Sequence, residues 1–171
     1  QFLGLYTTTL SLIDMEELDR ILMENVERIL EFLFPQCHEE MTLTGSHVYG
    51  YPTEDSDVDF MLLDTHKSYV MDRLNTLNIL VEKSEVYDCI TIRLGSDIIN
   101  LLFLDDNNLE AWKYANKAML ALKCCNVYTI TYTLMHHKKN RCEMFSAMVT
   151  EFGGVPMLYE IDSDEDDGDW E

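Results

Sequence analysis

The clearest hydrophobic pattern in the chain is helical and lies near its start. Apolar residues recur at spacings of three and four on one face, while glutamates occupy the rest of the surface. The apolar set is Leu18, Ile21, Leu22, Ile29, Leu30 and Leu33. We expect a helix over about residues 14–34. Asp14 and Glu17 have the spacing of a capping box, and Pro35 cannot continue the helix.

Shorter apolar runs predict strands. The run at 41–44 leads into Gly45-Ser46, and the run at 57–63 alternates acidic with apolar residues before becoming fully apolar. That second pattern is typical of a strand whose start lines a site and whose end is buried. The runs at 88–94 and 98–104 are separated by a short gap that contains glycine, which predicts a hairpin.

Three further helices are expected, over about residues 68–77, 107–122 and 134–150. The stripe of the second consists of Leu109, Trp112, Ala115, Met119 and Leu122. In the last helix we expect Phe145 and Met148 to face inward. The pattern predicts one folded domain over residues 1–159, followed by a segment that is too acidic and too poor in apolar residues to fold by itself.

Charge narrows the classes of partner. The formal net charge is -20, and the acidic tail, which we define as residues 160–171, holds eight acids and no Lys or Arg. The rest of the chain therefore carries -12. Binding to a nucleic acid backbone normally needs a basic surface, so duplex DNA is a disfavoured partner. No apolar run approaches the roughly 20 residues that span a bilayer, and no membrane role is expected. The tail would suit a basic protein partner.

The five cysteines contain no Cys-x-x-Cys pair, and their number is odd. Free thiols in the reducing cytoplasm are the favoured interpretation. A zinc site built from Cys124 or Cys125, His136 or His137, and Cys142 is the alternative, but its spacing matches no standard finger.

The residues richest in chemistry lie between the first two predicted strands. Glycine at position 45 lets a phosphate approach the backbone, and the hydroxyl of Ser46 can donate to a phosphate oxygen. Asp57 and Asp59 follow at the start of the next strand. Residues two apart on a strand point to the same side, so both carboxylates should face one point. Such a pair, together with phosphates, suits Mg²⁺.

Gly45-Ser46, a polar spacer and the Asp57-Val58-Asp59 triplet together resemble the signature of the DNA polymerase β-like nucleotidyltransferase superfamily. They are most similar to the small stand-alone members of bacteria and phages. The resemblance implies an α+β (mixed α/β) fold, a small mixed sheet with helices mainly on one side. It also implies two divalent metals, Mg²⁺ or Mn²⁺, and transfer of a nucleoside monophosphate from a nucleoside triphosphate.

The resemblance also assigns roles. Gly45 and Ser46 would bind the phosphates, and Asp57 and Asp59 would bind metal. The family usually has a third catalytic carboxylate on a later strand, where this chain has Asn100. An amide can coordinate metal through its oxygen but cannot accept a proton as a carboxylate does, which puts turnover in doubt. The alternatives for a third acid, Asp88, Asp97 and Asp105, each lie at a predicted strand end.

Basic residues are concentrated in one segment. Half of the twelve Lys and Arg lie between Lys113 and Arg141, where there is no Asp or Glu. Lys113 and Lys117 are four apart and share a helical face. They could contact the triphosphate or an anionic acceptor, or they could pair with acidic parts of the same chain.

Two hypotheses for function follow. The first is a nucleotidyltransferase whose acceptor is a protein side chain, a small molecule or an RNA end. The second is a catalytically weakened relative that acts by binding a nucleotide or a partner. A third, less favoured, is an interaction module that binds no nucleotide.

Overall fold

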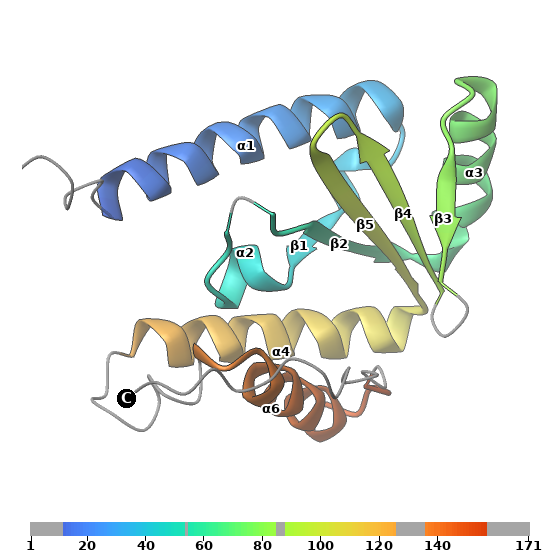
Figure 1. Ribbon diagram of the computed structural model, residues 1–171. Coiled ribbons are helices and arrows are strands. Elements are labelled where there is room, and N and C mark those ends of the chain that lie inside the picture. Colours follow the sequence, from blue (N-terminus) through green and yellow to red (C-terminus); the bar gives the residue numbers. More distant parts are fainter. Residues whose placement is uncertain (1–11, 54, 85–87, 126–135, 157–171) are drawn as a thin grey trace, which may run out of the picture. The chain divides into compact units, whose positions relative to one another are not determined.

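The computed structural model describes residues 12–53, 55–84, 88–125 and 136–156 (Figure 1). These residues form two compact units, one ending at Glu40 and the other beginning at Met41. We describe each unit by itself. Residues 134–135 of the last predicted helix, and the acidic tail, lie outside the described residues.

The first unit is mainly helix α1, Leu12–Leu33, followed by the short 3-10 helix η1, His38–Glu40. The helix predicted from the apolar pattern is confirmed, but its cap is not. Because α1 begins two residues before Asp14, that residue lies inside the helix and cannot be its N-cap. The buried stripe runs through Val26, Leu30 and Leu33, whereas Ile21, which was expected to face inward, is exposed.

The second unit contains a five-stranded sheet in the order β1-β2-β5-β4-β3. Its strands are β1 (Thr42–Thr44), β2 (Val58–Leu63), β3 (Val81–Lys83), β4 (Cys89–Leu94) and β5 (Asp97–Leu104). Strands β2 and β5 are parallel, and every other neighbouring pair is antiparallel. The β4–β5 hairpin was predicted. Strand β3 was not, because its three residues are too short and too polar to show a pattern.

The helices of this unit are α2 (Ser46–Tyr49), α3 (Lys67–Thr76), α4 (Asp106–Cys124) and α6 (Lys138–Glu151), with the 3-10 helix η2 (Asp64–His66) between β2 and α3. The three longer helices confirm the predicted ones in type and place. The Asp105 carboxylate caps α4 by accepting from the backbone N–H of Asn108 at 2.8 Å. Among the described residues, no helix is long and apolar enough to cross a membrane.

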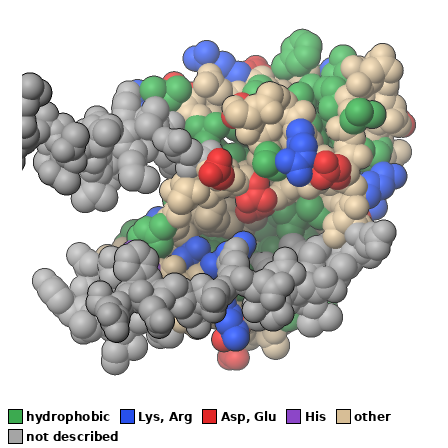
Figure 2. Space-filling model, in the orientation of Figure 1, with side chains coloured by type: hydrophobic (Ala, Val, Ile, Leu, Met, Phe, Trp, Pro, Cys, Tyr) green, Lys and Arg blue, Asp and Glu red, His purple; other side chains and the backbone are tan. Residues whose placement is uncertain are grey.

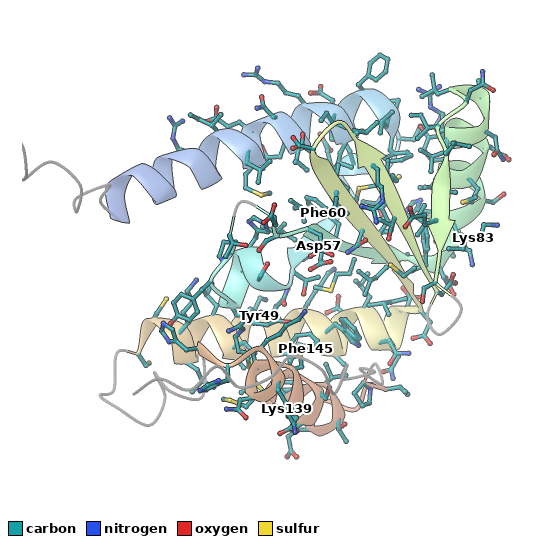
Figure 3. All side chains as sticks on the ribbon, viewed as in Figure 1. Tyr49, Asp57, Phe60, Lys83, Lys139 and Phe145 are labelled. Atoms are coloured by element: carbon teal, nitrogen blue, oxygen red, sulfur yellow. The ribbon has the colours of Figure 1, made fainter. Side chains whose placement is uncertain are left out.

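One part of the hydrophobic core lies between the sheet and the helices α4 and α6. Helix α4 packs on β2 and β5, and α6 packs on α4 (Figure 1). Phe145 of α6 is buried, stacks on Tyr49 of α2 at 5.2 Å and meets Trp112 of α4 edge-on at 5.1 Å. Figure 3 shows Tyr49 and Phe145 facing each other. Burial of these large rings fixes α2 and α6 beside the sheet, and the predicted α+β class is confirmed.

Candidate active site

A row of polar residues crosses one face of the sheet. Thr44 of β1 is in register with Asp59 of β2, Asp59 with Asn100 of β5, and Asn100 with Thr91 of β4. In-register neighbours on adjacent strands point to the same face. On β2 that face continues with Met61, which belongs to the core formed with α4 and α6. The sheet therefore presents this polar row directly beside the core.

The Asn100 amide joins the two predicted carboxylates. Its Nδ2 donates to Asp57 Oδ2 at 2.5 Å and to Asp59 Oδ1 at 2.9 Å. Its Oδ1 accepts from the Thr91 hydroxyl at 2.7 Å. Ionised carboxylates can only accept hydrogen bonds, so the amide must turn its NH₂ toward them. The structure thus brings Asp57, Asp59 and Asn100 together. It adds Thr91, a residue that no sequence pattern had singled out.

Asp59 is in an environment that disfavours its charged form. Burial, and after it the neighbouring Asp57 carboxylate, raise its pKa to about 7, although the hydrogen bond from Asn100 and the Lys138 ammonium act in the opposite direction. Two carboxylates held this close repel each other when both are ionised. A cation placed between them would relieve that repulsion.

The Gly45-Ser46 turn lies against the same carboxylate. Gly45 has φ 70° and ψ -150°, a conformation that is essentially restricted to glycine. A Cβ at this position would overlap with the carboxylate of Asp59. The turn continues into α2, in which the N–H groups of Val48 and Tyr49 both donate to the Gly45 carbonyl at 3.1 Å. Glycine is therefore required here both by the backbone and by the closeness of Asp59.

None of the three alternative acids joins this cluster. Asp88 forms an ion pair with Lys67 near the start of β4. Asp97 begins β5 three residues before Asn100, so it points to the opposite face. The side chain of Asp105 is used in capping α4. The third residue beside Asp57 and Asp59 is an amide.

The basic residues between Lys113 and Arg141 fall into two groups. Lys113 pairs with Glu110 at 3.3 Å, and Lys117 lies over the ring of Tyr114 at 5.5 Å. These two predicted phosphate contacts thus have neighbours on their own helix. Lys138, in the first turn of α6, is close enough to Asp59 to lower its pKa. Lys139, the next residue, points away from Asp57 (Figure 3).

A second basic group surrounds Tyr51, just after the Gly45-Ser46 turn. The Tyr51 ring stacks on His136 at 4.0 Å. Lys123 Nζ lies 5.1 Å and the Arg141 guanidinium 6.0 Å from the ring centre. On the face seen in Figure 2, acidic and basic side chains lie close together. The charge segregation seen in the sequence indicated the segment, but only the fold shows which of its cations lie beside the turn.

The described residues contain no group of three or more His, Cys, Asp and Glu side chains arranged to hold a metal ion. Cys142 has a free thiol. Burial raises the pKa of this thiol, which disfavours the thiolate that zinc requires. A metal beside the Gly45-Ser46 turn would therefore depend on the carboxylates of Asp57 and Asp59, together with oxygens supplied by a ligand.

Comparison with known proteins agrees with this geometry. Residues 23–117 match the family model described as the nucleotidyltransferase domain. The match includes the Gly45-Ser46 turn, Asp57, Asp59 and Asn100, and it ends before Lys123. No curated protein and no solved structure matches the chain. Since the match covers more than half of the chain, the protein belongs to the nucleotidyltransferase domain family.

Proposed function

We propose that the protein is a nucleotidyltransferase that depends on a divalent metal, Mg²⁺ or Mn²⁺, held by Asp57 and Asp59, and that binds its nucleoside triphosphate at the Gly45-Ser46 turn. One observation carries the proposal. The carboxylates of Asp57 and Asp59 converge on a single atom, Asn100 Nδ2, beside the turn that packs on Asp59. Such a turn next to paired carboxylates suits a phosphate chain that shares a metal with them.

The residues present fit one divalent metal. The donor set is all oxygen, and Mg²⁺ is commonly bound by one or two carboxylates plus phosphate oxygens. The raised pKa of Asp59 supports the same interpretation, because burial and the charge of Asp57 make this pair hard to ionise without a cation. When bound, the metal would supply positive charge that stabilises the phosphates and the leaving pyrophosphate.

The reaction would be the transfer common to the family. An acceptor hydroxyl oxygen forms a bond to the α-phosphorus, the bond from that phosphorus to the bridging oxygen breaks, and pyrophosphate leaves with the electron pair. The acceptor proton must pass to a base or to water. Ser46 would donate to a phosphate oxygen, and Lys138 would offset the negative charge next to Asp59. We include Lys113 and Lys117 as further triphosphate contacts, as the sequence predicts.

Asn100 determines how fast a transfer we expect. In this position it holds the two carboxylates but carries no charge and cannot accept the acceptor proton. A second metal would therefore be poorly held, and transfer would be slow. The same observation favours a second candidate function, that of a weakened relative which binds a triphosphate without turning it over.

The acceptor, a protein partner and the location are proposed from the composition of the chain. The acceptor is a protein side chain, a small molecule or an RNA end, because an acidic chain is poorly suited to duplex DNA. A basic protein bound through the acidic tail is a further candidate partner. The free thiols of the five cysteines are consistent with a cytoplasmic location.

One experiment separates these possibilities. The protein is incubated with Mg²⁺ or Mn²⁺ and each of the four ribonucleoside triphosphates carrying a radiolabelled α-phosphate, and self-modification is checked by mass spectrometry. Label transfer that is lost in Asp59→Asn supports the enzyme. A rise in melting temperature that requires both triphosphate and metal, without label transfer, supports the weakened relative that only binds a triphosphate. If neither label transfer nor a rise in melting temperature is seen, both candidate functions are wrong, and an interaction module that binds no nucleotide is favoured.

A further inference from the structure

Helix α4 contacts the end of β1, immediately before the Gly45-Ser46 turn, through a side chain that the proposed reaction does not use. Asn116 is a buried polar residue on this helix, 6% exposed. Its Nδ2 donates to the Leu43 carbonyl at 2.9 Å, and its Oδ1 accepts from the Thr44 hydroxyl at 2.8 Å. A carbonyl can only accept, so this pairing fixes the orientation of the amide. Both partners lie in the last two residues of β1, immediately before Gly45.

This attachment matters because β1 is weakly held by the sheet. It has three residues, lies at the edge and, within the part of the chain that the structure describes, pairs with β2 alone. The turn that follows it leaves no room for movement toward the carboxylate, since even a Cβ on Gly45 would overlap with Asp59. A small displacement of β1 would therefore change the distance between the turn and the carboxylate pair. Asn116 supplies a second anchor, from the helix layer.

The other end of the turn has an anchor on the same helix. Lys123 Nζ donates to the Gly50 carbonyl at 2.6 Å, at the residue that follows α2. Gly50 is itself closely packed, because a Cβ there would lie 2.7 Å from Ser46 Cα. Lys123 is seven residues after Asn116, which is about two helical turns, so both side chains lie on one face of α4. One helix thus contacts the residues immediately before the segment 45–50 and its last residue, Gly50.

We propose that Asn116 and Lys123 are positioning residues, through which α4 holds the segment 45–50 in register with Asp59. The consequence for ligand binding rests on the proposed function. Phosphates at the turn and a metal at the carboxylates must fit together, and a misplacement of about 1 Å in such a site can cost about 100-fold in rate. Asn116 and Lys123 would set this register without touching the reacting atoms.

The test uses three disruptive variants, one restoring variant and a matched control. Asn116→Leu keeps the approximate size but removes both hydrogen bonds, Thr44→Val removes one of them, and Lys123→Met removes the anchor at Gly50. Thr44→Ser should restore the bond lost in Thr44→Val. The control is Asn107→Leu, since Asn107 also lies on α4 and donates to a backbone carbonyl, that of Gly153 at 3.2 Å, away from the turn.

The first measurement is hydrogen–deuterium exchange at the amides of Val48, Tyr49 and Gly50, which needs no nucleotide. We expect exchange about tenfold faster or more in Asn116→Leu and Lys123→Met, and unchanged exchange in the control. Unchanged exchange in all variants would overturn the proposal. If Asn116→Leu does not fold, Thr44→Val and Lys123→Met decide the result, because Thr44→Val removes only the bond to Asn116 and Lys123→Met leaves the bonds of Asn116 in place.

The second measurement is the affinity for each of the four ribonucleoside triphosphates with Mg²⁺, and kcat and KM separately if transfer is detected. We expect affinity or kcat to fall about tenfold or more in variants whose melting temperature stays near that of the unaltered protein. Equal loss in Asn107→Leu would show a general effect of helix stability and would contradict positioning. No binding by the unaltered protein would contradict the proposed function, while the exchange data would still decide whether α4 holds the turn.

Discussion

Asn100 donates a hydrogen bond to Asp59, its in-register neighbour on the adjacent parallel strand. The same NH₂ group also donates to Asp57. In a site where the family usually has a third carboxylate, this amide holds the first two together without adding charge. We expect it to stabilise the cluster when no metal is bound, and on the proposed function it takes the place of the acid that would help transfer. This relationship leads to the first two predictions.

Asn100→Asp should increase transfer in the presence of Mg²⁺ or Mn²⁺. The new carboxylate would strengthen metal binding and could accept the acceptor proton. In EDTA the same variant should be less stable, by about 1–3 kcal/mol, because three acids would then share one site and two hydrogen bonds would be lost. Label transfer and urea unfolding with and without metal measure both effects. Fast transfer by the unaltered protein would contradict the expectation that Asn100, in place of an acid, makes transfer slow.

The stability of the metal-free protein should carry a pH dependence that originates at Asp59. Its pKa is about 7 in the folded protein against 3.8 for the ordinary side chain, so the folded state holds this proton more tightly than the unfolded state. The associated stability is complete below about pH 4 and is lost as the pH rises to about 7. The loss is at most about 4 kcal/mol, since one pKa unit corresponds to about 1.4 kcal/mol.

Asp59→Asn should remove this loss. Urea unfolding in EDTA at about pH 5 and about pH 8 should therefore give a smaller pH difference in Asp59→Asn than in the unaltered protein. An equal difference in the two proteins would show that other groups cause it.

Gly45→Ala should be far more damaging than Gly95→Ala. Both glycines have positive φ, 70° and 66°, so each substitution strains the backbone, and the ψ of -150° at Gly45 makes its conformation essentially restricted to glycine. A Cβ on Gly45 would overlap with Asp59, whereas nothing lies within 4 Å of one on Gly95. Thermal unfolding should show a large loss only for Gly45→Ala. Similar losses in the two variants would mean that the turn does not pack on Asp59 as described.

Thr91→Val should weaken the polar row without changing its shape. The valine removes the hydroxyl that donates to Asn100 Oδ1 and leaves a partly buried acceptor without this donor. We expect a loss of about 1 kcal/mol in the free energy of unfolding, which Thr91→Ser should largely restore. Equal stability of the valine and serine variants would indicate that the hydroxyl does not bond to Asn100.

Removal of the acidic tail should leave folding intact. Residues 160–171 contain few apolar side chains, so truncation after Tyr159 should change the melting temperature by little. The full-length chain is the reference for this comparison. A large fall in melting temperature would show that the tail packs on the rest of the protein.

The sequence by itself determined the elements and the kind of chemistry. Amphipathic patterns predicted α1 and α4, because apolar side chains must share one face to be buried, and helices were also expected where α3 and α6 lie. The glycine turn and the spaced aspartates indicated the family, because these residue types have few other uses at that distance. Short elements such as β3 and α2 were not predicted, since three or four residues show no reliable period.

The neighbours of each site residue were decided only by the tertiary structure. Asn100 was predicted to face the aspartates, but its use as a donor between them depends on the parallel pairing of β2 with β5. Thr91 and Asn116 join the site through the register of β4 and the packing of α4. These contacts link residues up to 73 positions apart. Local patterns reflect preferences within a few residues, whereas register and packing are set by burial of the whole core.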